Sequence, residues 1–276
     1  MIGGFDKILD VNVIGDAMEN VKSGAPAYCT NLFASQGQLT KWVKNGYLRL
    51  CVGTDAALLN REDQTFSHLY FLAASLDSLQ RCLKERMMAL SGTVVMDLVG
   101  ALGSVAELCK IAYAAGFLPY KRLIRMKRLH SPTDLAHSGD TTVGFGKPDD
   151  ADRISEMLHE AFDPLCEQLP GMDEIYEAIQ NHSILIIRVE EEPGALLHFE
   201  TQGRSSRIRY WLVTPAEQGK GFGSALMRHY LDMHVEVRRF TLWVREENEP
   251  AISKYQHYGF TCDDLIDQVV TLSFVS

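Results

Sequence analysis

The chain has 276 residues, of which 46% are apolar and 23% are charged, and it carries a formal net charge of −9. This length allows two ordinary domains, and the composition excludes a disordered or a fibrous protein. The acidic balance argues against a general binder of nucleic acid or of anionic membranes. No apolar run is long enough to span a bilayer, and the first residues lack the pattern of a secretion signal. We therefore expect a cytoplasmic protein that binds neither nucleic acid nor membrane.

The cysteines are scattered, without a CxxC pair or a spacing typical of a metal site. There are six of them: Cys29, Cys51, Cys82, Cys109, Cys166 and Cys262. In a reducing compartment such thiols stay unpaired and mostly serve as small core residues. We expect no metal site.

The first half of the chain alternates between predicted strands and helices. Short apolar runs at 47–53, 56–60 and 68–74 resemble an antiparallel meander. Next come a helix over 76–90, a strand over 93–99, a helix over 104–117 and a strand over 120–129. The last strand is strongly basic. It is either a docking surface for an acidic partner or a phosphate, or a strand with one solvated face.

A segment rich in Ser, Thr, Asp and Gly divides the chain. We predict a first domain over residues 1–130, a linker over 131–140 and a second domain over 141–276. The second domain begins with a short strand at 141–147 and helices over 149–162 and 172–182. Asp149 and Asp150 are suited to cap the first of these helices.

The remaining elements of the second half define its fold class. Strands at 183–189, 195–201 and 207–213 form an antiparallel meander. A helix over 223–237, a strand over 240–244, a helix over 249–258 and a strand over 267–274 follow. This order predicts a mixed α/β or α+β domain rather than a repeating βαβ sheet. A Gly-Phe pair closes corresponding helices in the two halves, at 116–117 and 259–260, which suggests an ancient duplication.

A glycine-rich segment, "VTPAEQGKGFGSALM" at 213–227, joins a predicted strand to a predicted helix. The first N–H groups of a helix have no partner within the helix, and the helix dipole is positive at that end. Glycine removes side chains that would keep an anion away from these amides, and it permits positive φ. The segment therefore predicts a phosphate site. It is neither a Walker A loop nor a Rossmann loop, because both spacings are absent.

This segment resembles the acetyl-coenzyme A signature of the GNAT superfamily of N-acetyltransferases. In that family a strand ending in V-x-P leads into [QR]-x-x-G-x-[GA], which is matched here by Val213, Pro215, Gln218, Gly221 and Gly223. The stretch 242–260 is similar to a second family motif through Asn248, Ala251, Tyr255, Gly259 and Phe260. The resemblance covers about residues 141–276. It implies two GNAT-like domains in tandem, each with a mixed, mostly antiparallel sheet flanked by helices.

The resemblance also implies how acetyl-coenzyme A would be bound. The strand residues Trp211, Leu212 and Val213 would pair with the pantetheine arm through their backbone. Asn248 and Tyr255 would also contact the coenzyme. The pyrophosphate would be held by the loop residues Gln218, Gly219, Lys220, Gly221, Phe222, Gly223 and Ser224. Gly221 and Gly223 would be the points of close approach, and Gly219 would serve the turn.

The resemblance implies an oxyanion donor and a general acid, and it leaves the general base open. The N–H of Trp211 would polarise the thioester carbonyl as an oxyanion hole. Tyr255 would be the general acid that protonates the departing thiolate. Some family members place a Glu base four residues before the oxyanion donor, but Arg207 stands there. Glu200, His198 or a water chain are the alternatives.

The first half lacks the signature. Aligning the two Gly-Phe pairs places Ala112 opposite Tyr255 and Val105 opposite Asn248. The helix that begins near residue 76 has no glycine before it, and Asp77, a suitable N-cap, would repel a pyrophosphate. We expect a degenerate copy with a structural role.

The expected function is transfer of an acetyl group from acetyl-coenzyme A to a primary amine of a small molecule or peptide, without a metal. The alternative is a non-catalytic acyl-coenzyme A sensor or a partner-binding module. A monomer or a homodimer is expected. The acidity of the chain mildly favours a cationic acceptor.

Overall fold

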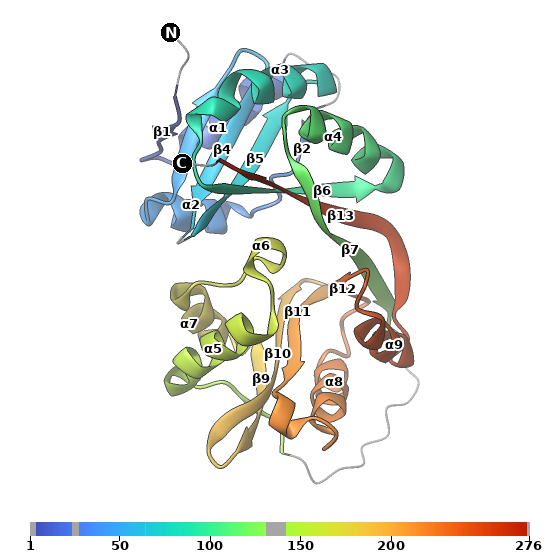
Figure 1. The fold of residues 1–276 in the computed structure, drawn as a ribbon. Coiled ribbons are helices and arrows are strands. Elements are labelled where there is room, and N and C mark those ends of the chain that lie inside the picture. The colour runs from blue at the N-terminus through green and yellow to red at the C-terminus, as the bar shows by residue number, and fades with distance from the viewer. Residues whose placement is uncertain (1–3, 24–27, 64, 131–141, 275–276) are drawn as a thin grey trace. The chain divides into compact units, whose positions relative to one another are not determined.

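The computed structural model describes residues 4–23, 28–63, 65–130 and 142–274. The predicted linker at 131–140 lies outside them. The chain divides into two compact units (Figure 1), Met1–Leu123 with Asp264–Ser276 as unit 1 and Ile124–Asp263 as unit 2. The domain boundaries predicted from sequence, 1–130 and 141–276, stay a prediction.

Unit 1 is built on a mixed sheet with helices on both faces. Its helices are α1 (Asn12–Ser23), α2 (Gln36–Lys44), α3 (Leu76–Arg86), η1 (Met87–Ala89) and α4 (Leu102–Ala114). Its strands are β1 (Asp6–Lys7), β2 (Cys29–Thr30), β3 (Leu48–Val52), β4 (Ala56–Glu62), β5 (Phe66–Ala73) and β6 (Thr93–Ala101), joined by parts of β7 (Leu118–Leu129) and β13 (Thr261–Ser273). The strand order is β1-β3-β4-β5-β6-β13-β7, with β2 on β5. β5 and β6 pair in parallel.

Unit 2 has the same plan. Its helices are η2 (Pro148–Asp150), α5 (Ala151–Ala161), α6 (Pro164–Glu167), α7 (Met172–Gln180), η3 (Pro215–Glu217), α8 (Phe222–Met233) and α9 (Glu249–His257). Its own strands are β8 (Gly144–Phe145), β9 (Ile184–Val189), β10 (Glu192–Gln202), β11 (Ser205–Val213) and β12 (Arg239–Arg245). The order is β7-β12-β11-β10-β9-β8, and β11 runs parallel to β12.

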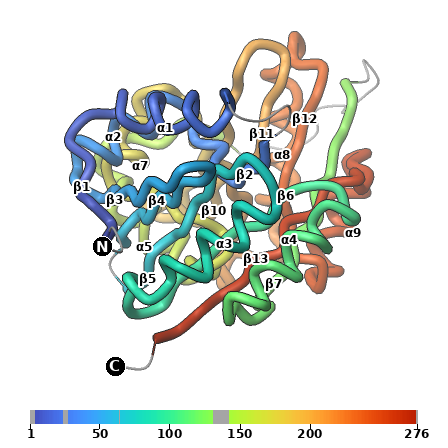
Figure 2. The backbone as a smooth tube through the Cα atoms, turned by 90° about the horizontal axis from the view of Figure 1, so that it is seen from above, coloured from blue at the N-terminus to red at the C-terminus, as the bar shows by residue number. Residues whose placement is uncertain are grey.

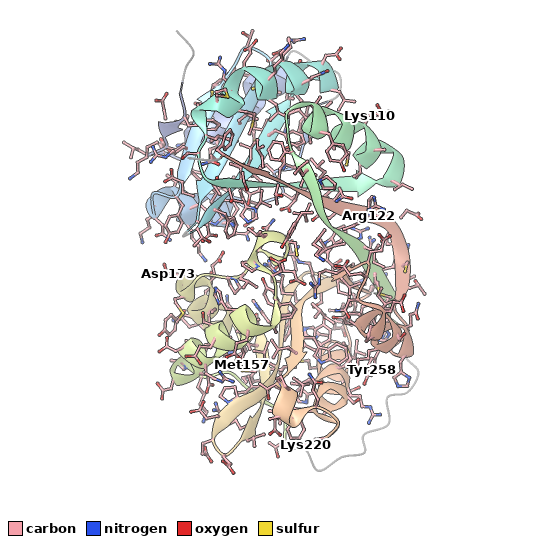
Figure 3. All side chains as sticks on the ribbon, viewed as in Figure 1. Lys110, Arg122, Met157, Asp173, Lys220 and Tyr258 are labelled. Atoms are coloured by element: carbon pink, nitrogen blue, oxygen red, sulfur yellow. The ribbon has the colours of Figure 1, made fainter. Side chains whose placement is uncertain are left out.

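Each sheet has a hydrophobic core on both faces. In unit 1, α1 and α2 cover one face and α3 and α4 the other (Figure 2). In unit 2, α5 and α7 pack on one face, where Met157 is buried (Figure 3), and α8 and α9 pack on the other. This arrangement follows from the strand patterns, since residues that alternate along a strand point to opposite faces.

The two units repeat one another in detail. The N–H of Phe117 donates to the carbonyl of Ala112 at 3.1 Å, and the N–H of Phe260 donates to the carbonyl of Tyr255 at the same distance. The glycine before each Phe has positive φ, 96° and 80°, which closes the helix in a left-handed turn. Both Phe side chains are buried. The predicted mixed fold with two similar halves is therefore confirmed.

The last strands depart from a simple tandem arrangement. β7 closes the first half of the chain, but its residues from Ile124 onward belong to unit 2, beside β12. β13 closes the second half, and its residues from Leu265 to Ser273 pair with β6 in unit 1. Each sheet thus contains a strand from the other half.

Three local predictions need correction. Ser75, not Asp77, caps α3 by accepting a hydrogen bond from the N–H of Ser78, and Asp77 lies in the first helical turn. Asp150 does not cap α5 with its side chain; its carboxylate accepts from the N–H of Lys147 and pairs with Arg188. The helix predicted to end at residue 237 ends at Met233.

Candidate active site

The candidate site lies where β11 and β12 diverge. These strands pair in parallel from Ser205 with Arg239 to Ile208 with Leu242, and the pairing ends there. Both strands continue, β11 to Val213 and β12 to Arg245. At the same level the register of β11 with β10 shifts, so that Arg209 is an extra residue between Ile208 and Tyr210. A bulge of this kind bends a strand, which accounts for the divergence.

Beyond the bulge, the hydrogen bonds of β11 show which of its backbone groups face β10 and which face the opened side. The N–H of Thr214 donates to the carbonyl of Gly194 in the strand opposite, at 3.0 Å. Because hydrogen-bonding residues alternate along an antiparallel pair, Tyr210 and Leu212 also face β10. The backbone groups of Trp211 and Val213 then face the opened side, and the Val213 carbonyl accepts from the Gln218 side chain at 3.4 Å. The opened side therefore offers an N–H donor from Trp211.

The glycine loop follows at the end of this strand. Gly219 and Gly221 have φ of 83° and 84°, and a Cβ at either position would meet nothing within 4 Å. Gly221 is the N-cap of α8, so the N–H groups of Phe222, Gly223 and Ser224 form its first turn. These amides and the open space beside them suit a phosphate.

Gly223 has a different requirement. A Cβ there would lie 3.3 Å from Cζ2 of Trp211 and 3.5 Å from Cγ2 of Val213, because α8 packs tightly on β11. Packing alone therefore explains this glycine, and its predicted part in phosphate binding stays a prediction. Lys220 (Figure 3) forms an ion pair with Glu217 at 2.8 Å.

Tyr255 and Trp211 lie together beside the opened strands. Their ring centroids are 5.4 Å apart. Tyr255 is 8% exposed, and burial, with a further contribution from the charge of Glu167, raises the pKa of its hydroxyl. The hydroxyl therefore keeps its proton at neutral pH, as a general acid requires. Asn248 caps α9, since its Oδ1 accepts from the N–H of Ala251 at 3.2 Å.

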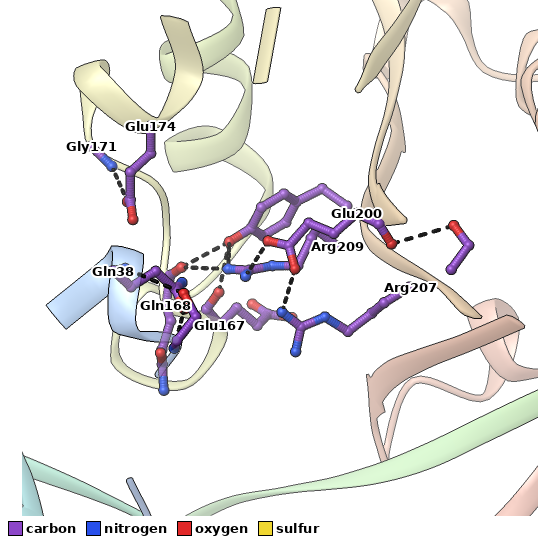
Figure 4. A network of polar contacts seen from close by, with 11 residues as sticks. Gln38, Glu167, Gln168, Gly171, Glu174, Glu200, Arg207 and Arg209 are labelled. Carbon is purple, nitrogen blue, oxygen red and sulfur yellow. Dashed lines mark hydrogen bonds and ion pairs between the residues drawn. The ribbon is translucent and has the colours of Figure 1, made fainter. Parts of the chain in front are cut away.

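Two side chains were considered as bases, and the surroundings of each are constrained; those of Glu200 are drawn in Figure 4. Glu200 pairs with Arg207 at 2.7 Å and with Arg209 at 2.9 Å. Burial would raise the pKa of Glu200, but the charges of these two arginines lower it overall. His198 is 6% exposed, and burial, aided by Arg209, lowers its pKa to about 3. The lowered pKa makes each side chain a weaker base. For Glu200, the interpretation as an ion-pair partner is therefore favoured.

Sequence reasoning missed a third carboxylate, Glu167 at the end of α6. Its Oε2 accepts from the N–H of Asp163 at 2.7 Å, and its Oε1 lies 3.8 Å from Nε of Arg245. Burial raises the pKa of Glu167. The four-residue helix has no periodic pattern, and only the Asp163-Pro164 pair, an N-cap followed by Pro, marks it in the sequence.

The corresponding place in unit 1 is filled by its own chain. β5 and β6 pair in parallel only from Phe66 to His68 and then both continue. Between them the amide nitrogen of Asn31 donates to the carbonyls of Leu69 and Asp97, at 3.1 and 3.0 Å. Its Oδ1 accepts from the N–H of Phe71 at 2.7 Å. β2 pairs alongside, Cys29 with Ala73 and Thr30 with Leu72.

Other predicted features have plain structural surroundings. In the basic strand β7, Arg125 pairs with Asp263 at 2.7 Å, Arg122 donates to Gln268, and Arg128 lies over the ring of Phe240. These internal contacts favour the structural interpretation of that strand. None of the six cysteines, all of which the structure describes, forms a disulfide. Among the described residues, no group of His, Cys, Asp and Glu is arranged to hold a metal ion, and no helix is both long and apolar enough to cross a membrane.

We compared the chain with families of known proteins and with solved structures. The model of the acetyltransferase (GNAT) family matches residues 152–260. No curated protein matches the chain. A tandem GNAT protein from the clavulanic acid biosynthesis pathway superposes with a TM-score of 0.58 at 14% identity, over 95% of this chain and 94% of that one.

Two further solved structures share the fold. A GCN5-related N-acetyltransferase from Sphaerobacter thermophilus has a TM-score of 0.60 at 15% identity, covering 87% of this chain and 86% of its own. A Drosophila protein has a TM-score of 0.59 at 11% identity, over 98% and 99% of the two chains. Together with the repeated elements, these likenesses show that the chain has a tandem GNAT fold, within which residues 152–260 match the model of the GNAT acetyltransferase family.

Proposed function

We propose that this protein transfers an acetyl group from acetyl-coenzyme A to a primary amine of a small molecule or a peptide, and that unit 2 carries the reaction. The observation that carries the proposal is the divergence of β11 from β12 next to the N-terminus of α8. The backbone amides on the opened side of β11 and the N-terminus of α8, which suits an anion, therefore lie on one continuous stretch of backbone. A thioester with a pyrophosphate on a flexible arm fits both.

The residues of the loop and strand fit the coenzyme. Open space at Gly219 and Gly221 leaves room for a pyrophosphate against the first turn of α8. The backbone of Trp211 and Val213 would pair with the amide groups of the arm as an added strand does. The coenzyme supplies an activated acetyl group.

The chain's own groups would then perform the transfer. The N–H of Trp211 would hold the negative charge that develops on the carbonyl oxygen when the amine attacks. The Tyr255 hydroxyl would give its proton to the leaving sulfur, and it recovers a proton from the nitrogen of the product. The aromatic contact with Trp211 keeps the acid close to the oxyanion donor.

A second function is supported by a specific observation. Arg207 occupies the position of the strand Glu that some relatives use, and Glu200 is held by two arginines. A protein that bound acyl-coenzyme A without turnover would tolerate this arrangement. Release of free thiol from acetyl-coenzyme A in the presence of a panel of primary amines separates the two. The proposal predicts amine-dependent release, whereas the sensor predicts binding without release.

A further inference from the structure

The turn that contains Glu167 is attached to both diverging strands of unit 2. On the β11 side, the Tyr210 hydroxyl donates to the carbonyls of Glu167 and Gln168 at 3.0 and 2.8 Å. Arg209, the bulge residue, donates to the Gln168 carbonyl at 3.3 Å (Figure 4). On the β12 side, the Glu167 carboxylate approaches Arg245 at 3.8 Å. The carboxylate is therefore held at the opening between the two strands.

The backbone of this turn includes one of the four described residues other than glycine that have positive φ. Gln168 has φ of 39°, in the left-handed region that a residue with a side chain rarely adopts. Such strain persists where surrounding contacts enforce it, and it is concentrated at functional sites. Here the enforcing contacts come from Tyr210 and Arg209, so the position of Glu167 is fixed by the same bulge that opens the strands.

The charges around Glu167 are mixed. Burial raises its pKa, the N–H of Asp163 and the charge of Arg245 lower it, and Asp163 and Glu247 raise it again, with a net rise. Tyr255 on α9 is near enough for the charge of Glu167 to raise its pKa. The Glu167 side chain is not fully buried, since 16% of it is exposed. Asp163 and Glu247 make the surroundings acidic apart from Arg245.

From this geometry we infer that Glu167 binds the ammonium group of the acceptor and takes its proton. The inference rests on the proposed acetyl transfer and narrows the acceptor to a primary alkylammonium ion. The carboxylate accepts one proton from the ammonium group, and the neutral amine forms the C–N bond as the C–S bond breaks. The thiolate leaves with the proton of Tyr255, which is restored by the second proton lost from nitrogen. Glu167 then releases its proton to water.

The kinetic test compares two amines. Putrescine is a cation at neutral pH and needs a base, whereas hydroxylamine is neutral there and does not. Glu167→Gln keeps an oxygen that can accept from the N–H of Asp163, so the turn is preserved. With putrescine this variant should lower kcat/KM by about 100-fold. The fall of kcat/KM at acidic pH that the parent protein shows should also disappear. With hydroxylamine the rate should change little.

Two variants complete the kinetic test. Glu167→Asp keeps the carboxylate and should restore part of the rate with putrescine. Glu160→Gln removes an exposed carboxylate of α5 that lies 3.8 Å from Arg153, and it should leave both rates unchanged. An equal fall with both amines in Glu167→Gln, or no fall with putrescine, overturns the inference.

A second readout does not depend on turnover. In protein labelled at the glutamate carboxyl carbons, the Glu167 resonance is identified by its absence in Glu167→Gln. Added putrescine should lower the pKa of this carboxyl, because a bound cation favours the charged form. An unchanged titration contradicts the inference even if acetyl transfer is found with other amines. A lowered pKa without any acetyl transfer would instead mean that the proposed function fails and the ammonium site remains.

Discussion

The ring of Tyr255 packs between two other aromatic rings, and these contacts do not involve its hydroxyl. Its ring lies 5.4 Å from that of Trp211 and 6.0 Å from that of Phe260. Tyr255→Phe keeps these contacts and removes only the hydroxyl that we propose as the acid. We expect kcat to fall by about 100-fold while the affinity for acetyl-coenzyme A changes little, as measured by steady-state kinetics and calorimetry. Unchanged turnover would exclude Tyr255 as the acid.

Gly219 and Gly221 form a matched pair, because they share the same positive φ and the same open surroundings. Alanine at either position should lower the free energy of unfolding by a similar amount, about 1–2 kcal/mol. Only Gly221 caps α8, so Gly221→Ala should weaken binding of acetyl-coenzyme A more than Gly219→Ala does. Equal affinities in calorimetry would remove the special role of Gly221 in phosphate approach.

At the scale of single elements, β6 and β13 carry two acidic side chains at diagonally neighbouring positions of their pairing. Asp97 lies opposite Val269, and Asp267 lies opposite Val99. Oδ1 of Asp267 is buried without a hydrogen-bond partner in the described structure. Burial, together with the charge of Asp97, raises the pKa of Asp267 well above its ordinary value. The folded state therefore holds a proton that the unfolded state releases, and stability declines as pH rises above about 4.

Asp267→Asn removes this charge while keeping the shape of the side chain. We expect the free energy of unfolding at pH 8 to rise by about 1–3 kcal/mol, and its decline between pH 4 and pH 8 to become shallower. Urea unfolding at several pH values measures both. A variant that is less stable than the parent at pH 8 would show that the Asp267 carboxylate is satisfied in the folded state.

Most elements of unit 2 were predicted from the sequence, because each is marked by a pattern within its own residues. Apolar alternation marks β9 and β10, and helical spacing marks α5. The glycines at 219 and 221 predicted a loop of positive φ, which is confirmed. The bulge at Arg209 and the turn at Glu167 were not predicted. The bulge depends on the register of β11 with β10, and the turn depends on hydrogen bonds from Tyr210 and Arg209, which lie about 40 residues further along the chain. A single sequence shows neither.

At the scale of the whole chain, the sequence predicted two similar halves from the Gly-Phe pairs, and the comparisons confirm a tandem GNAT fold. The sequence did not predict the placement of β7 and β13. Residues 265–273 follow unit 2 in the sequence, yet they pair with β6 because their register matches across long sequence separation. Contacts of this kind leave no local pattern.

The filled opening in unit 1 leads to a prediction about the number of coenzyme sites. Since Asn31 bridges β5 and β6 and an acidic first turn replaces the glycine loop, we expect one acetyl-coenzyme A to bind per chain. Calorimetric titration gives this number directly. A stoichiometry of two would contradict the assignment of a structural role to unit 1.

Asn31 itself is expected to stabilise unit 1. Asn31→Ala leaves two buried carbonyls and the N–H of Phe71 without this partner, which should cost about 1–3 kcal/mol in urea unfolding. Asn20→Ala, at an exposed position of α1, serves as the control. Equal stability of the two variants would mean that the Asn31 bridge contributes little.

The most direct test of acetyl transfer at the β11–β12 opening follows both products at once. Purified protein is mixed with acetyl-coenzyme A and putrescine, free thiol is measured with a colorimetric reagent, and acetylated amine is measured by mass spectrometry. The account predicts equal amounts of both products, formed catalytically by the parent chain and strongly reduced in Tyr255→Phe. Tight binding of acetyl-coenzyme A without either product, across a panel of primary amines, would contradict it.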